Sequence, residues 1–214
     1  MLWQRIEAGE LTGLKLANQA NFKQAHISNF LNRKRGISLE GMDRVLAVQH
    51  LSVLDLLDPA EGEFENVLLV DGQVAANEQI ITNENVRDIL KFKKSFLKRL
   101  RPNMASPRDD WRRFVLIKVD QRDGMSMYPR LLPGATVLID RHYNSLQPYR
   151  KGEQNMYGVR KEGGSTVKYV ELAGNNLILR PHNQAFAVDV VTMEEGKSFA
   201  DYIVGRVCHV AIDT

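Results

Sequence analysis

The feature that most constrains the fold is a change of hydrophobic period along the chain. Over residues 12–58, apolar side chains recur at intervals of three and four, which is the spacing of one helix face. From Phe114 onward, short β-branched runs are separated by turn residues, which is typical of strands. The sequence therefore predicts a multidomain α + β protein, in which an all-α unit precedes a mostly antiparallel β unit.

The distribution of charge supports the same division. Residues 59–90 carry seven acidic side chains and one basic one, and residues 91–113 carry nine basic and two acidic, although the net charge is only +3. The acidic block is weakly periodic, which is typical of a linker, although its apolar VLLV run suggests a short docked strand. We therefore predict a helical domain at 1–58, an acidic linker at 59–90 and a β-domain at 91–214.

Cysteine usage and hydropathy bear on the compartment. Cys208 is the only cysteine, so no internal disulfide can form and a reducing cytoplasm is the simplest setting. The start of the sequence, MLWQRIEAGE, lacks the apolar run of a signal peptide, and no run of about 18 apolar residues follows. The five histidines do not have metal-ligand spacing. We expect a cytoplasmic protein with no cofactor, no metal and no membrane partner.

The helical half has recognisable starts and turns. Thr12 and Ser38 each stand just before an apolar-periodic run, where a side-chain oxygen can cap a helix. Asn21 falls between two such runs, and asparagine is the usual substitute for glycine where a turn requires a left-handed residue. These signals predict successive short helices joined by tight turns.

The run LANQANFKQAHIS, residues 16–28, resembles the helix-turn-helix of the Cro/phage-repressor family, and QAHISNFLN is similar in layout to the reading helix of lambda-type repressors. The resemblance implies a double-stranded DNA operator as partner, with this helix in the major groove. It implies that Gln24 forms hydrogen bonds with an adenine and that the cations at 33–35 contact DNA phosphates. The residues assigned to DNA are Lys23, Gln24, Ala25, Ser28, Asn29, Asn32, Arg33, Lys34 and Arg35.

Two positions depart from the family pattern. Asparagine stands at 21 where the family has glycine, and Lys23 stands where it usually has a capping serine or threonine. The residues alone also allow a helical protein-interaction domain, in which the NRKR run is only a solvated charge cluster.

A possible nucleophile lies in DGMSMYPRLLPG, residues 123–134, where Ser126 stands between two methionines. In TVKYVEL, strand alternation places Lys168 on the same face as Val170 and Leu172, which is an apolar setting. A serine is a poor nucleophile until a base takes its proton, and a free lysine is protonated at neutral pH. Because burial disfavours the ammonium form, a buried Lys168 is a candidate general base.

These segments resemble the LexA/phage-repressor peptidase family in order and in spacing. Four segments each match a family segment: GMSM with its later Pro-Gly turn, VKYVEL, whose Lys168 lies 42 residues after Ser126, NLILRPHNQAF and IVGRVCHV. The resemblance implies a LexA-like β-domain that forms a homodimer on a palindromic operator. It also implies a Ser126–Lys168 dyad, an oxyanion held by the backbone N–H groups of Ser126 and Met125, and a RecA-type filament as the trigger of cleavage.

The bond that such a dyad would cut departs from the family pattern. The family usually cuts an Ala-Gly or Cys-Gly bond in the connecting segment, and residues 59–125 contain neither pair. The best candidate by position is Ala76–Asn77, 50 residues before Ser126. Asparagine replaces glycine only partly in unusual backbone conformations, which argues against self-cleavage.

Our first interpretation is a sequence-specific DNA-binding transcriptional regulator, a repressor of prophage or stress-response type. Two alternatives stay open. The chain is an active Ser/Lys peptidase, either self-cleaving or acting on other chains as a signal peptidase does, or it is a repressor whose β-domain senses a ligand or partner without catalysis.

Overall fold

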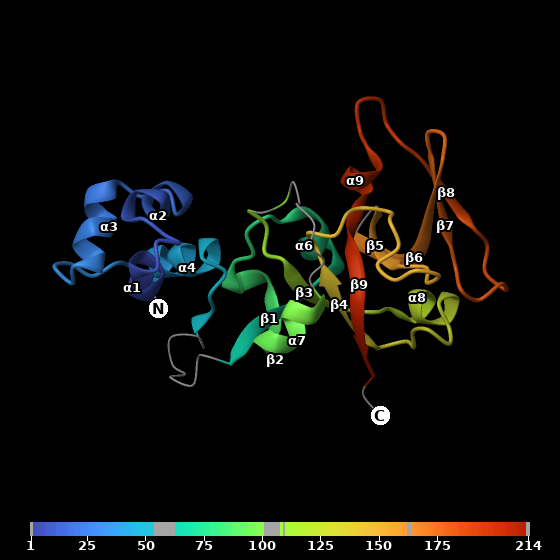
Figure 1. Ribbon diagram of the computed structural model, residues 1–214, viewed down its shortest axis with the longest axis horizontal. Coiled ribbons are helices and arrows are strands. Elements are labelled where there is room, and N and C mark those ends of the chain that lie inside the picture. Colours follow the sequence, from blue (N-terminus) through green and yellow to red (C-terminus); the bar gives the residue numbers. More distant parts are fainter. Residues whose placement is uncertain (1, 54–62, 101–107, 109, 162–163, 213–214) are drawn as a thin grey trace.

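The computed structural model describes residues 2–53, 63–100, 108, 110–161 and 164–212 (Figure 1). Helices come first and a large sheet follows, as the change of period predicts. The helices are α1 Leu2–Glu7, α2 Gly13–Gln19, α3 Gln24–Leu31, α4 Leu39–Val48, α6 Gly72–Asn77, α7 Lys94–Leu100, α8 Gln121–Ser126 and α9 Phe199–Tyr202, with a 3-10 turn, η1, at Asn83–Asn85. The strands are β1 Phe64–Val70, β2 Val86–Lys93, β3 Phe114–Lys118, β4 Thr136–Asp140, β5 Met156–Lys161, β6 Gly164–Ala173, β7 Asn176–Arg180, β8 Asp189–Thr192 and β9 Ile203–Ala211.

The predicted helix starts and turn are present in the helical half. Thr12 Oγ1 accepts a hydrogen bond from the Lys15 backbone N–H at 3.1 Å, and Ser38 Oγ accepts one from Gly41 at 3.1 Å. Asn21 has a φ of 54° in the turn between α2 and α3, which is the left-handed conformation that the sequence predicts. Ser52 is likewise placed in the sequence to cap a helix over residues 52–58, and that segment lies almost wholly outside the described residues.

The helical half has an apolar cluster of its own. Leu16 of α2, Ile27 of α3 and Val45 of α4 are all fully buried in it. The small residue Ala17 is also buried there, so α2 and α3 approach each other closely. Burial of this cluster, rather than helix propensity, holds such short helices together.

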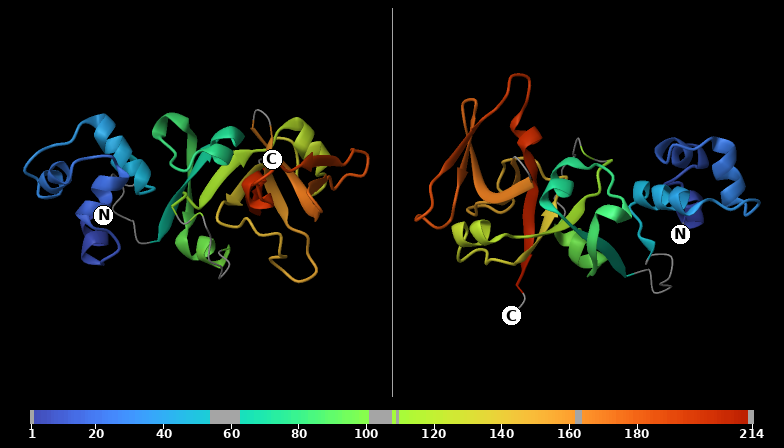
Figure 2. Two further views of the ribbon diagram at one scale, coloured as in Figure 1. Left: turned by 90° about the horizontal axis from the view of Figure 1, so that it is seen from above. Right: turned by 180° about the vertical axis from the view of Figure 1, so that it is seen from behind.

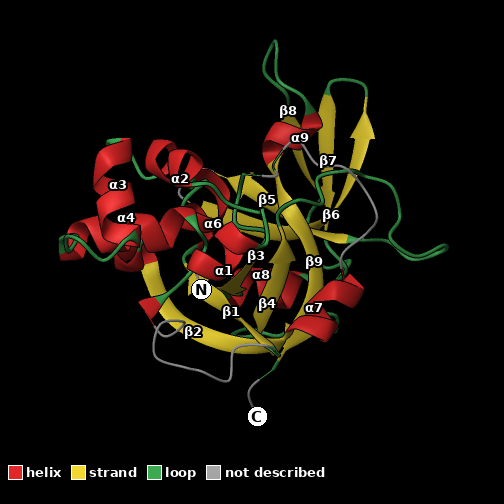
Figure 3. Ribbon diagram, turned by 60° about the vertical axis from the view of Figure 1, so that its left-hand side comes forward, coloured by secondary structure: helices red, strands yellow, loops and turns green. Residues whose placement is uncertain are grey.

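The strands form one mixed sheet in the order β2-β1-β3-β4-β9-β5-β6-β7-β8. Strand β1 runs parallel to β3, and the remaining pairs are antiparallel, which confirms the mostly antiparallel prediction for the described residues. The sheet curves strongly, and β6, β7 and β8 extend from one end of it (Figure 3). Strand β9 therefore joins the part built from β1–β4 to the part built from β5–β8.

The structure corrects the expected linker at 59–90. From Phe64 on, this segment is part of the sheet, because β1 pairs with both β2 and β3. The physical reason is its apolar run, in which Val67, Leu68 and Val70 are almost fully buried. The strand-rich half therefore begins near residue 64 rather than at 91.

The helical half lies at one end of the molecule and touches the sheet half (Figures 1 and 2). The Asn66 side chain of β1 donates to Ser52 Oγ at 3.1 Å, and the Asn83 side chain donates to the Asp43 carboxylate of α4. Burial, followed by the positive charge of Arg112, lowers the pKa of His50 to about 4. The contact between the two halves is therefore polar and holds a histidine in its neutral form.

Candidate functional site

Ser126 is the last residue of α8, and a tight local structure holds it. The Asp120 carboxylate caps α8 by accepting a hydrogen bond from the Asp123 backbone N–H at 2.7 Å. Gly124 lies against the backbone of the following loop, where a Cβ atom would come within 2.2 Å of the Pro133 nitrogen. The glycine of DGMS thus allows two backbone segments to pack closely, and this packing fixes the position of Ser126.

The structure brings Ser126 and Lys168 into contact. Lys168 lies on β6 and its Nζ donates to Ser126 Oγ at 2.8 Å, while Ser126 Oγ donates to the backbone oxygen of Asp123 at 3.0 Å. Ser126 is 2% exposed and Lys168 is 5% exposed. The geometry of a Ser/Lys dyad is therefore present, and the pair is buried.

Two further residues, Asp123 and Thr166, belong to this cluster and were not predicted from the sequence. Lys168 Nζ donates to Asp123 Oδ1 at 2.7 Å and to Thr166 Oγ1 at 3.2 Å. The Asp123 carboxylate also accepts from Thr166 Oγ1 at 2.6 Å and from the Val167 backbone N–H at 3.0 Å. Spacing offered a signal for both residues, because Asp123 stands three before Ser126 on a helical turn and Thr166 stands two before Lys168 on a strand.

The surroundings of Lys168 correct the expected apolar setting. On its face of β6, Val170 is only half-buried and Leu172 is 47% exposed. The Lys168 Nζ is instead surrounded by oxygen atoms, among them the carboxylate of Asp123. Lys168 and Asp123 therefore form a buried ion pair rather than an isolated lysine in an apolar pocket.

The loop that follows β7 covers the Ser126 turn. The Asn183 backbone N–H donates to the backbone carbonyl oxygen of Ser126 at 2.9 Å. The Asn183 side-chain amide donates to the backbone carbonyl oxygen of Met125 at 3.1 Å. Met125 and Ser126 both lie in the last turn of α8, where N–H groups normally bond to preceding carbonyls. The oxyanion role expected for these groups therefore needs the turn to open, and it stays a prediction.

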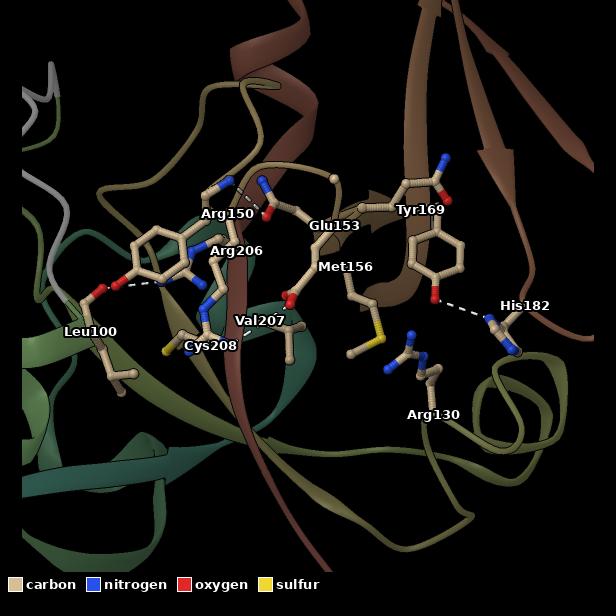
Figure 4. Close-up of a pocket in the computed structure, with 14 residues that line it drawn as sticks. Leu100, Arg130, Arg150, Glu153, Met156, Tyr169, His182, Arg206, Val207 and Cys208 are labelled. Atoms are coloured by element: carbon tan, nitrogen blue, oxygen red, sulfur yellow. Dashed lines mark hydrogen bonds and ion pairs between the residues drawn. The ribbon is translucent and has the colours of Figure 1, made fainter.

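Two cavities lie beside the cluster. One, of about 310 Å³, is lined by the starts of α6 and β6, by the end of β3 and by Asp123 of α8. The other, of about 530 Å³, includes Tyr169, whose hydroxyl lies 3.0 Å from His182 Nδ1 (Figure 4). Tyr169 follows Lys168 on β6, so the larger cavity lies across the strand from the lysine. Burial raises the pKa of Cys208, which lines this cavity, to about 12, so its thiol stays protonated at neutral pH.

The residues assigned to DNA lie on and just after α3. Ile27 is fully buried, whereas Gln24, Ala25 and Ser28 are exposed, so α3 presents a polar face outward. Lys23 is the N-cap residue and makes no side-chain cap hydrogen bond, as its departure from the family pattern predicts. Asn29 is half-buried, and the remaining exposed positions are Lys23, Asn32, Arg33, Lys34 and Arg35.

The candidate cleavage bond lies in a helix. Ala76 is fully buried in α6, and Asn77 ends that helix, where its side-chain oxygen accepts from Arg160 at 2.9 Å. This peptide bond is held in helical conformation, and no contact joins either residue to Ser126 among the described residues. The structure therefore does not bring Ala76–Asn77 to Ser126, and cleavage there requires α6 to unwind.

Across the described residues, no group of three or more histidine, cysteine, aspartate or glutamate side chains could hold a metal ion. In the same described residues, no helix has the length and apolar character needed to cross a bilayer.

Comparison with known proteins agrees with this geometry. The LexA repressor of Actinobacillus succinogenes is 29% identical over 166 residues, which cover 77% of this chain and 69% of that protein. The profile of the family described as Peptidase S24-like matches residues 68–208, from β1 to β9. That range includes Asp123, Ser126 and Lys168 and covers well over half of the sequence. The chain thus belongs to the Peptidase S24-like family.

Proposed function

We propose that this protein is a sequence-specific DNA-binding transcriptional regulator, a repressor of prophage or stress-response type. Its helical half, residues 1–58, binds a palindromic operator as a helix-turn-helix domain, and its strand-rich half forms the homodimer. The observation that carries the proposal is the outward polar face of α3, which follows a left-handed turn at Asn21 and is anchored by the buried Ile27. The similarity to a protein named LexA repressor supports it.

Dimerisation follows from the physics of DNA recognition. One short helix contacts only a few base pairs, whereas two helices spaced by a helical turn give usable affinity. The exposed cations at 33–35 supply phosphate contacts beside α3. We place the regulator in the cytoplasm, where its operator is accessible.

Replacing Gln24 with alanine is expected to weaken binding to the preferred sequence about tenfold or more, because a lost bidentate base contact costs ~1–3 kcal/mol. Selection from a random duplex library defines the preferred sequence of the wild-type protein, and titration then compares the variants. Gln154→Ala, an exposed glutamine of the strand-rich half, is the matched control and should bind as the wild type does. An unchanged affinity and preference for Gln24→Ala would remove α3 from the DNA interface.

We also propose that Ser126 and Lys168 form a latent Ser/Lys peptidase, with Ser126 as nucleophile, Lys168 as general base and the backbone N–H groups of Ser126 and Met125 at the oxyanion. The direct contact between the two side chains supports this assignment. A RecA-type filament is the partner we propose as trigger. The burial of the pair and the helical state of Ala76–Asn77 favour a resting form that does not cut itself.

Incubation of the purified protein at alkaline pH is expected to yield slow fragmentation that Ser126→Ala abolishes, because a serine attacks only when a neutral base beside it can take its proton. Fragment masses decide between Ala76–Asn77 and the Ala8–Gly9 pair, which lies in an exposed turn after α1 with Gly9 at a φ of 75°. Serine-dependent digestion of added peptides would instead favour a peptidase that acts on other chains. Intact protein at every pH would favour a repressor whose β-domain senses a ligand or partner.

A further inference from the structure

We propose that the cavity of about 530 Å³ lined by β9, β6 and the loop before β5 binds a small organic molecule with two oxyanion groups, either phosphates or carboxylates. Its volume falls within the ~300–1,000 Å³ that is typical of sites for small molecules. Neither Ser126 nor Lys168 lines this cavity, so the site is separate from the candidate dyad. It lies in the strand-rich half, and it takes its ligand whether or not the chain binds DNA.

Arg206 of β9 is a buried cation with unused hydrogen-bond donors. It is 5% exposed, and one of its terminal nitrogens donates to the Leu100 backbone oxygen at 3.0 Å. A guanidinium carries five N–H groups, yet this side chain forms no other hydrogen bond and no ion pair among the described residues, and its Nε is buried without a partner. A buried charge is costly unless an opposite charge accompanies it. Because Arg206 lines the cavity, an anion bound there supplies that charge.

Aromatic rings hold this guanidinium in place. Its central carbon lies 3.8 Å from the centre of the Tyr149 ring and 5.1 Å from the centre of the Tyr143 ring. Tyr149 is fixed in turn, because its hydroxyl donates to the Arg99 backbone oxygen at 2.9 Å. A ring against the flat face of a guanidinium leaves its edge available, and this edge forms paired hydrogen bonds with phosphates and carboxylates. Arg206 is therefore preorganised to bind an oxyanion.

A second group of polar side chains lies across the cavity from Arg206. Figure 4 shows Arg130, Tyr169 and His182 together at one end and Arg206 at the other. The Tyr169 hydroxyl lies 3.0 Å from His182 Nδ1, and Arg130 is exposed and forms no ion pair among the described residues. This end therefore offers a second cation for an oxyanion.

The middle of the cavity is less polar, and positive charge predominates around it. In Figure 4, Met156 and Val207 lie between the two ends that carry arginines. The described residues that line the cavity include three arginines and one carboxylate, Glu153, which lies 3.8 Å from Arg150 in a solvent-exposed pair. The other two arginines have no carboxylate partner among these residues. A molecule with an oxyanion at each end and a less polar body fits this arrangement.

The test measures binding of small anions to the full chain by isothermal titration calorimetry. Fructose 1,6-bisphosphate carries two phosphates, and adipate carries two carboxylates. Fructose 6-phosphate and hexanoate have the same carbon chains with one anionic group each. Arg130→Gln removes the exposed cation of the cavity. Arg122→Gln is the matched control, because Arg122 is an exposed arginine of α8 that does not line the cavity.

We expect at least one doubly charged probe to bind with a Kd below about 1 mM, and its singly charged partner to bind about tenfold more weakly. Arg130→Gln should weaken binding of that probe about tenfold, whereas Arg122→Gln should bind it as the wild type does. Binding of the bisphosphate alone assigns the site to phosphates, and binding of adipate alone assigns it to carboxylates. No binding of either probe overturns the proposal. Binding that Arg130→Gln leaves unchanged also overturns it, because the anion then lies elsewhere, as on the cations at 33–35.

The role of Arg206 is measured in the wild-type protein, because replacement of so buried a side chain can unfold the chain. The Nε–H group of Arg206 has no partner among the described residues, so its proton and nitrogen NMR signals should shift as the probe saturates the site. Signals of Arg206 that stay in place while the probe binds would show that the anion does not reach this guanidinium, and the proposal would fail.

Discussion

Gly124→Ala is expected to lower the free energy of unfolding by about 3 kcal/mol and to abolish the labelling of Ser126 by a fluorophosphonate probe, a reagent whose phosphorus bonds to a reactive serine Oγ as fluoride leaves. The added Cβ would lie 2.2 Å from the Pro133 nitrogen and 2.6 Å from the Leu132 carbonyl carbon. Both are backbone atoms that cannot rotate away, so α8 must separate from the following loop. Because Ser126 ends that helix, its distance from Lys168 must change as well. Chemical denaturation measures the first effect and the rate of labelling measures the second.

Gly13→Ala is the matched control for this substitution. Gly13 begins α2, and a Cβ there would meet only the end of the Leu31 side chain, at 3.7 Å. Alanine favours a helix over glycine by up to ~1 kcal/mol, so this variant should be as stable as the wild type or more so. A Gly124→Ala protein with wild-type stability and wild-type labelling would show that the close approach does not position the nucleophile.

Acidification from pH 7 to pH 5 is expected to cost the protein about 2 kcal/mol of stability through His50 alone. Burial, the largest cause, and the positive charge of Arg112 lower the folded pKa of this histidine from 6.5 to about 4. The unfolded chain therefore binds the proton more tightly than the folded chain does. The contribution is complete above pH 6.5, and it is lost as the pH falls from 6.5 towards 4.

His50→Asn isolates this contribution. His50 has a φ of 55°, and asparagine tolerates that left-handed conformation while carrying no titratable group. Urea unfolding at pH 7 and pH 5 should show a smaller loss in the variant than in the wild type, by about 2 kcal/mol. Equal losses in the two proteins would mean that His50 is not held neutral by the contact between the halves.

The local structure of the helical half could be predicted because its signals are local. Thr12 and Ser38 cap helices, and Asn21 takes the left-handed turn, since each role depends on a few neighbouring residues. The linker prediction was wrong for a complementary reason. The acidic charge of that segment is a property of its composition, whereas the pairing of β1 between β2 and β3 depends on residues far along the chain.

The sequence predicted the serine and the lysine of the candidate site, but it did not predict the carboxylate that lies beside the lysine. Motifs identified Ser126 and Lys168, and the structure places them in contact. Alternation on β6 suggested an apolar setting for the lysine, yet alternation describes only one strand. The partner that matters, Asp123, comes from α8, and only the packing of α8 against β6 shows that its carboxylate reaches the lysine.

The place of β9 in the sheet has a consequence for synthesis on the ribosome. Strands β1 to β4 and strands β5 to β8 emerge first, and β9, which pairs with both β4 and β5, emerges after them. Until then, each nascent part carries an open strand edge, and such edges promote misassembly. A ribosome stalled before residue 203 would therefore hold two unjoined partial sheets, and premature termination there would yield a product prone to aggregate.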